Sequence, residues 1–226
     1  QNDTTTVIDR NDEGITSSVY LQNTWPPLAD LVVTGGIRVN HYDQTDQYYF
    51  EPRLSFSYNQ TGKIKVKGAW GQYNQYVTRV VREDISKGSR DFWLLANDDL
   101  NPVSAATHYV AGASYETDQF LFDVEAYYKD LSGLSEYTQR LSNNVSNRST
   151  ELDELFFEGT GYAQGVEFLL QKKFGTYTGW LGYTLSEVIY DFPDISANPY
   201  PALHDQTHEY KIVNSLRLGK WTLSGT

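Results

Sequence analysis

The stretch that decides the fold is Phe120-Leu121-Phe122-Asp123-Val124-Glu125-Ala126-Tyr127-Tyr128-Lys129. Side chains in an extended chain point alternately to its two faces. One face therefore carries Phe120, Phe122, Val124, Ala126 and Tyr128, and the other carries Asp123, Glu125, Tyr127 and Lys129. Strands of about 9 to 11 residues with one apolar and one polar face are typical of a transmembrane β-barrel, whose strands face lipid on one side and a lumen on the other.

The same alternation recurs along the chain and predicts ten strands. They span residues 14–23, 30–42, 48–58, 63–77, 107–116, 119–130, 161–173, 176–187, 208–218 and the segment from the Gly219-Lys220 turn to Thr226. Short turns, such as Trp25-Pro26-Pro27, alternate with long polar loops at 78–106, 131–160 and 188–207. Short turns are thus expected at the periplasmic end of a barrel and long loops at its extracellular end.

A soluble β-sandwich also has alternating strands, and it is the alternative fold. The length of the strands and the density of charge on their polar face favour the barrel. The predicted fold class is all-β, an antiparallel transmembrane β-barrel with long extracellular loops and short periplasmic turns.

The composition is compatible with this fold. Aromatic residues make up 15% of the 226 residues, with 18 Tyr, 10 Phe and 5 Trp, which is enough for strands and for aromatic girdles. The formal net charge of -11 argues against nucleic acid as a partner. Because the chain has no cysteine, a disulfide framework and a thiolate metal site are both excluded.

Several segments, taken in order, resemble the barrel of TonB-dependent outer-membrane receptors, in the forms common among Bacteroidetes. They are 35–42 (GGIRVNHY), 49–58 (YFEPRLSFSY), Leu100-Asn101-Pro102, 108–112 (HYVAG), 124–134 (VEAYYKDLSGL), 161–167 (GYAQGVE), 179–186 (GWLGYTLS) and 204–208 (HDQTH). Each motif is weak alone, but the ordered series covers nearly the whole chain.

The resemblance implies a 22-stranded barrel that is filled by an N-terminal plug domain. No plug precedes the predicted strands, and residues 221–226 differ from the aromatic-terminated last strand of the family. We therefore expect residues 1–226 to be a partial barrel of about ten strands, without the plug domain and the C-terminal strands.

The function implied by the resemblance is active import of a scarce nutrient, such as a siderophore, cobalamin, an oligosaccharide or a peptide. Expected partners are the TonB-ExbB-ExbD complex, reached through the plug, the ligand itself, and outer-membrane lipid and lipopolysaccharide. The expected location is the cell outer membrane. A passive outer-membrane porin and a soluble β-sandwich adhesin or carbohydrate-binding module are the alternatives.

Two groups of residues are candidates for the functional site. Arginine forks and aromatic platforms suit anionic or sugar-like ligands. The longest loop carries such residues, with lipopolysaccharide contact and plain loop packing as the alternatives to ligand contact: Arg79, Arg82, Arg90, Phe92 and Trp93. Charged residues on the polar strand faces are expected to line the lumen and to pair across strands: Arg38, Glu51, Arg53, Lys65, Lys67, Asp123, Glu125, Glu167 and Lys211.

No metal, cofactor or catalytic site is expected. His204 and His208 are about 13 Å apart on an extended chain, too far to share a metal ion. The acidic residues Glu151, Asp153, Glu154 and Glu158 lack the spacing of a calcium loop and are interpreted as a solvated loop. The sequence contains neither a nucleophile elbow nor a phosphate-binding loop, and so predicts no enzyme.

Overall fold

The computed structural model describes residues 13–60, 62–84, 88–97, 101–137 and 156–226. The described residues form strands β1 (Thr16–Leu28), β2 (Leu31–Tyr42), β3 (Gln47–Asn59), β4 (Ile64–Gln75), β5 (Val77–Asp84), β6 (Gly88–Leu95), β7 (Ser104–Glu116), β8 (Phe120–Tyr137), β9 (Phe156–Lys172), β10 (Tyr177–Asp191), β11 (Tyr200–Pro201), β12 (His208–Leu218) and β13 (Trp221–Gly225). None of these residues belongs to a helix long and apolar enough to cross a membrane.

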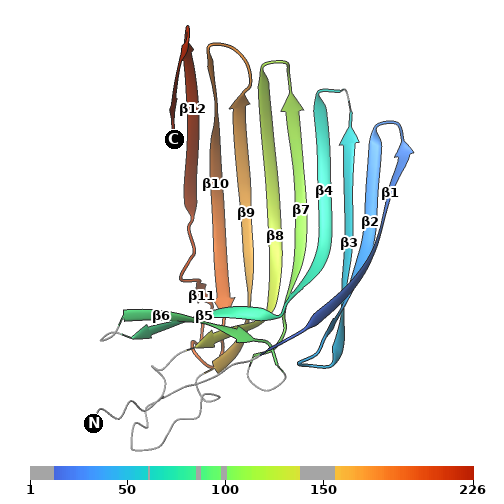
Figure 1. Ribbon diagram of the computed structural model, residues 1–226, viewed down its shortest axis with the longest axis vertical. Coiled ribbons are helices and arrows are strands. Elements are labelled where there is room, and N and C mark those ends of the chain that lie inside the picture. Colours follow the sequence, from blue (N-terminus) through green and yellow to red (C-terminus); the bar gives the residue numbers. More distant parts are fainter. Residues whose placement is uncertain (1–12, 61, 85–87, 98–100, 138–155) are drawn as a thin grey trace, which may run out of the picture.

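One antiparallel sheet organises the chain, and its strands follow one another almost in chain order (Figure 1). The order is β1-β2-β3-β4-β7-β8-β9-β10-β12-β13, and β11 pairs with the end of β10. Within the described residues β1 and β13 pair on one side only, so the sheet is open. The predicted all-β antiparallel fold is confirmed.

The connections differ between the two ends of the sheet. At the top of Figure 1, which we call the turn end, short turns join β1 to β2, β3 to β4, β7 to β8, β9 to β10 and β12 to β13. Gly62, Gly175 and Gly219 have φ angles of 71°, 109° and 61° in three of these turns, a region that favours glycine. The long connections lie at the opposite end, the loop end, as the alternation of turns and loops predicted.

The prediction of a turn at Trp25-Pro26-Pro27 is wrong. Strand β1 continues through these residues to Leu28, and the chain turns at Ala29-Asp30. The register shifts between Trp25 and Leu28, so the two prolines lie in an irregular part of the ladder where no amide hydrogen is needed.

The predicted loops are also shorter than expected. The segment 78–106 contains the β5-β6 hairpin, a separate two-stranded sheet that runs crosswise to the main strands at the loop end (Figure 1). The predicted loop 131–160 is shortened at both ends, because β8 continues to Tyr137 and β9 begins at Phe156. The ladder between these strands resumes after a bulge between Leu131 and Leu134.

The buried residues of the described chain gather at the loop end. Apart from the glycines of the sheet, they are Asn40, Tyr42, Thr45, Glu51, Leu94, Ala96, Asn101, Phe192 and Ala202. Most of the main sheet has no second layer against it, so its exposed apolar side chains need another apolar environment. Any packed site is therefore to be sought at the loop end.

Candidate functional site

The two faces of the main sheet have opposite chemistry. We call the face that carries Phe122 and Val124 the apolar face, and the face that carries Asp123 and Glu125 the charged face. On β8 the side chains of Asp123 and Glu125 are 23% and 30% exposed, whereas Phe122 and Val124 are 47% and 37% exposed. Since the apolar residues are the more exposed ones, the sheet suits lipid rather than water on its apolar face.

Aromatic residues border the apolar face at both ends. Strand register places Tyr48, Tyr109, Tyr128 and Tyr210 towards the loop end, and Trp25, Tyr58, Tyr115, Tyr177 and Trp221 towards the turn end. Tyr109 and Tyr115 are six residues apart on β7, which is about 20 Å of strand. Outer-membrane barrels have such girdles on either side of an apolar band of about 25 Å.

All nine charged residues predicted to line a lumen belong to the charged face. Lys67, Gly112, Glu125 and Glu167 are successive register partners across four strands. Arg38 is the partner of Glu51, while Arg53, Lys65, Asp123 and Lys211 follow the same alternation. Their assignment to a lumen stays a prediction.

Lys67 joins two carboxylates on a strand that is not its neighbour. Its Nζ lies 2.7 Å from Glu125 Oε2 and 3.3 Å from Asp123 Oδ1, across the intervening strand β7. Gly112 provides the passage, since a Cβ atom there would lie 2.8 Å from Lys67 Cε. Pairing was predicted between neighbouring strands, whereas this ion pair spans β7 and joins strands that are not neighbours.

Glu51 forms a second group of contacts, closer to the loop end. The residue is 4% exposed. Its carboxylate accepts hydrogen bonds of 2.9 Å from Arg53 Nη2 and from the Asn74 backbone N–H. The Arg53 guanidinium lies 4.7 Å from the centre of the Tyr73 ring, and that ring packs on His108 at 4.6 Å. Charged and aromatic groups alternate across β3, β4 and β7.

Residues 94–96, at the end of the β5-β6 hairpin, pack on the charged face at the loop end. Tyr42 belongs to that face, is 1% exposed, and donates a 3.0 Å hydrogen bond from its hydroxyl to the Ala96 carbonyl. Tyr76 packs on both Tyr42 and Tyr49, with ring centres 4.8 and 5.3 Å apart. Residues 94–96 therefore cover part of the charged face near its loop-end edge.

Tyr76 lies between β4 and β5, within this packed group. Burial raises the pKa of its hydroxyl to about 12, and the nearby charges of Glu51 and Tyr49 act in the same direction, while the Asn40 amide partly offsets them. The phenol therefore stays neutral at physiological pH and adds no charge to the loop end.

A second aromatic group lies at the loop end of β10. Phe192 is 1% exposed and packs on Tyr190 and Tyr200, with ring centres 5.9 and 6.4 Å apart. Tyr190 also contacts His204 at 5.9 Å. The connection after β10 is thereby anchored to the sheet.

The loop residues predicted to contact a ligand are only partly brought together. Arg79 and Trp93 are register partners in the β5-β6 hairpin, and both are exposed, Trp93 by 70%. Arg82 pairs in register with Arg90, and Phe92 with Val80. The side chains of Arg82, Arg90 and Phe92 lie outside the described part of the structure.

Sequence reasoning did not single out the packed residues Tyr42, Tyr49, Tyr76 and Asn101. Asn101 is 0% exposed, and its backbone N–H donates to Asn97 Oδ1 at 3.3 Å. It belongs to the Leu100-Asn101-Pro102 segment, so that motif was a usable signal. Burial of the three tyrosines depends on residues distant in sequence, and no local pattern indicates it.

The histidines considered as metal ligands have separate partners. His208 Nδ1 lies 3.0 Å from the Tyr183 hydroxyl, and His204 packs on Tyr190. Glu158 is in β9, whereas Glu151, Asp153 and Glu154 fall outside the described residues. Within the described ranges no three His, Asp or Glu side chains are grouped closely enough to hold a metal ion.

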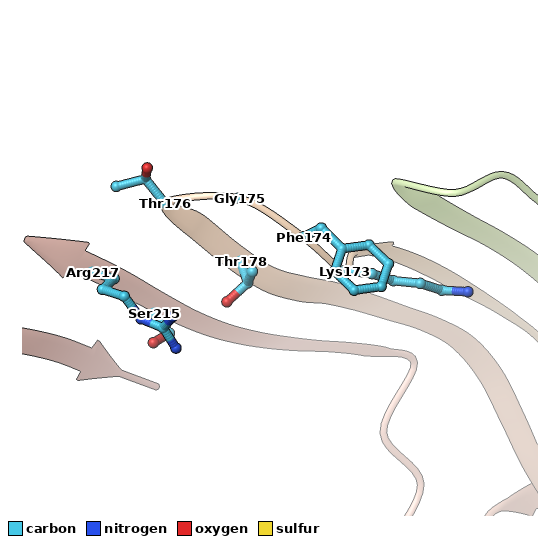
Figure 2. Close-up of a pocket in the computed structure, with 7 residues that line it drawn as sticks. All are labelled: Lys173, Phe174, Gly175, Thr176, Thr178, Ser215 and Arg217. Atoms are coloured by element: carbon cyan, nitrogen blue, oxygen red, sulfur yellow. The ribbon is translucent and has the colours of Figure 1, made fainter.

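A shallow hollow of about 190 Å³ lies at the turn end, away from the packed residues. Figure 2 shows Lys173, Phe174 and Gly175 on the β9-β10 turn, with Thr178, Ser215 and Arg217 beside them. In Figure 2 the Lys173 ammonium points away from Arg217, and it pairs with Glu116. The loop end, with its buried aromatic residues, remains the better candidate site.

Comparison with known proteins explains this arrangement. The family model described as TonB dependent receptor-like, beta-barrel, matches residues 1–225. The chain belongs to this family of outer-membrane receptor barrels. A search among curated proteins finds no match.

Two solved receptors share the fold. The siderophore receptor PirA from Acinetobacter baumannii superposes on 90% of this chain with a TM-score of 0.55 and 13% identity. The siderophore receptor PirA from Pseudomonas aeruginosa superposes on 92% of it with a TM-score of 0.50 and 12% identity. This chain covers 33% and 43% of those two receptors, so it spans less than half of their length.

Membership of the family decides between the predicted fold classes. The sheet is part of an outer-membrane β-barrel, and its apolar face is the face towards lipid. The soluble sandwich alternative is excluded. Members of the family are transporters and not enzymes, in agreement with the sequence prediction.

Proposed function

We propose that this barrel is part of a receptor that imports a scarce nutrient across the outer membrane with energy supplied through TonB. The main support for this proposal is the packing of residues 94–96 on the charged face, which is fixed by the hydrogen bond from Tyr42 to Ala96. Loop residues that cover the lumen side suit capture of a ligand, whereas a passive channel needs an open entrance.

The proposed partners are the TonB-ExbB-ExbD complex, acting through a plug domain, together with lipid and lipopolysaccharide around the apolar face. The charged face, with its nine predicted residues, is proposed to line the lumen. A siderophore is the ligand class that the two structural neighbours suggest, because both are siderophore receptors by name. Cobalamin, an oligosaccharide or a peptide remain the other classes to be tested.

The β5-β6 hairpin is the proposed point of first contact with the ligand. Arg79 and the 70% exposed Trp93 are opposite each other on it, which places a cation beside an aromatic surface. Arg82, Arg90 and Phe92 are proposed to contribute to the same contact. Loops carried by a rigid barrel are suited to this role, since they vary without disturbing the strands.

The test is growth of a deletion strain on single limiting nutrients. We expect slow growth on one nutrient only, and restoration by the full-length gene in cells with TonB but not in cells without it. Restoration in both backgrounds contradicts the proposal and indicates a passive channel. Replacing Arg79 and Trp93 together by alanine should raise the nutrient concentration needed for half-maximal growth, while the barrel remains present in the membrane.

A further inference from the structure

Basic residues form a group on the charged face, between its middle and the loop end. Arg53 on β3, Gly71 on β4, His108 on β7 and Lys129 on β8 are successive register partners. Arg38 on β2 lies two residues nearer the loop end than Gly36, the partner of Arg53, and it is itself the partner of Glu51. We call Arg38, Arg53, His108 and Lys129 the basic collar.

Among the described residues, the collar's three permanent cations, Arg38, Arg53 and Lys129, carry more positive charge than the neighbouring acids neutralise. Glu51, the carboxylate nearest to the collar on the described part of the charged face, accepts hydrogen bonds from Arg53 at 2.9 Å and from a backbone N–H. Arg38 faces the Tyr20 ring at 6.0 Å and Lys129 faces the Tyr127 ring at 5.2 Å, and within the described part of the chain neither cation has an ion pair. In addition, the Nε atoms of Arg38 and Arg53 are buried without a hydrogen-bond partner.

The wall nearer the turn end has the opposite character. Lys67 there is held by two carboxylates, and Lys211 is held by Glu209 at 3.0 Å. Glu125 lies four residues from Lys129 along β8, about 13 Å away. The positive charge of the collar is therefore too distant to be paired with these acids, and it is available to a partner from outside the sheet.

We propose that the basic collar binds a polyanionic solute, one that carries two or more carboxylate or phosphate groups, on its way through the receptor. This deepens the proposed function by naming a substrate class, and it rests on that function. Arg53 and Lys129 are separated by three strand spacings, about 14 Å. Because the basic residues of the collar are spread over four strands from β2 to β8 and not gathered on one, a ligand with several separated anionic groups fits the collar better than a single small anion.

The aromatic rings of the collar hold its cations in place. Tyr73 lies between the Arg53 guanidinium and the His108 ring, at 4.7 and 4.6 Å. A guanidinium that is already stacked on a ring loses little freedom when it binds a carboxylate or phosphate with two parallel hydrogen bonds. The collar is thus arranged for anions before a ligand arrives.

The experiment measures binding of inorganic tripolyphosphate to the purified full-length receptor in detergent, with the neutral sugar raffinose as a second probe. We expect saturable binding of tripolyphosphate that weakens with added salt, and no comparable binding of raffinose. Lys129→Gln and Arg38→Gln should each weaken tripolyphosphate binding about tenfold, as expected when one charged hydrogen bond is lost. Lys129→Arg keeps the charge and should restore binding.

Lys63→Gln is the matched control, because it removes the same charge from an exposed turn at the opposite end of the sheet. Heat-modifiable migration in gels identifies variants that fold. The proposal is overturned if the folded wild-type receptor does not bind tripolyphosphate, or if the collar variants bind it as well as wild type. It is also overturned if these variants lower the melting temperature without changing binding, since the collar then seats an acidic protein segment.

This measurement needs no TonB, whereas the growth test of the proposed function depends on it. A receptor that binds tripolyphosphate but supports growth without TonB contradicts the proposed function and leaves the collar intact. A receptor with TonB-dependent growth but without anion binding contradicts the collar proposal and leaves the proposed function intact. The two failures are therefore distinguishable.

Discussion

Gly112 gives Lys67 the room to reach across β7 to Asp123 and Glu125. A Cβ atom at this position would lie 2.8 Å from Lys67 Cε and 2.9 Å from the Val124 carbonyl oxygen, and that oxygen belongs to the backbone of the neighbouring strand. We expect Gly112→Ala to displace the lysine and to lower the free energy of unfolding by about 1–2 kcal/mol. Urea unfolding of the full-length receptor, followed by tryptophan fluorescence, measures this.

Gly35→Ala is the control for this substitution. The nearest atom to a Cβ there is Leu54 Cδ1, 4.0 Å away. Because alanine restricts the unfolded chain more than glycine does, the control should be neutral or more stable by about 0.5–1 kcal/mol. Equal losses in both variants contradict a role for the passage over Gly112.

Tyr76 gives the loop end a dependence on alkaline pH. Its pKa is about 12 in the folded state, mainly because of burial, against an ordinary value of 10.0. Between pH 10 and 12 the unfolded chain releases this proton while the folded protein keeps it, so stability falls as pH rises. The contribution is fully present below pH 10.

Tyr76→Phe cannot ionise, and it separates this effect from the titration of other groups. We expect the difference in unfolding free energy between the variant and wild type to move in favour of the variant as pH rises from 10 to 12. Urea unfolding at several pH values in this range measures it. A difference that stays constant with pH shows that the tyrosine titrates alike in both states.

At the scale of elements, Tyr42 holds residues 94–96, at the end of the β5-β6 hairpin, on the charged face. Tyr42→Phe removes the donor to the buried Ala96 carbonyl and should cost about 1–3 kcal/mol of local stability. We expect faster protease cleavage near residues 93–97 in receptor-bearing cells, with unchanged heat-modifiable migration of the barrel. Tyr48→Phe is the control, since Tyr48 is 66% exposed; cleavage at the same rate in both variants contradicts the role of Tyr42.

The strands could be predicted from the sequence because lipid and lumen impose an alternation that each strand carries locally. The β5-β6 hairpin was missed because Val80 and Val81 break the alternation of β5. Trp25-Pro26-Pro27 was interpreted as a turn because proline is common in turns, and only the irregular ladder explains its place in a strand. The packing of Tyr42, Tyr49 and Tyr76 depends on contacts between distant segments, which no periodicity records.

For the whole molecule, the membrane supplies the apolar environment that a second layer of protein supplies elsewhere. Val124 lies between the two aromatic borders of the apolar face and is 37% exposed. We expect Val124→Arg to cost about 2–4 kcal/mol of stability, the usual cost of an arginine near the middle of the bilayer. Phe174→Arg, in the exposed β9-β10 turn, should cost about 0–1 kcal/mol, because the membrane interface tolerates charge. Unfolding in urea from phospholipid vesicles compares the two variants, and equal costs contradict the assignment of the apolar face to lipid.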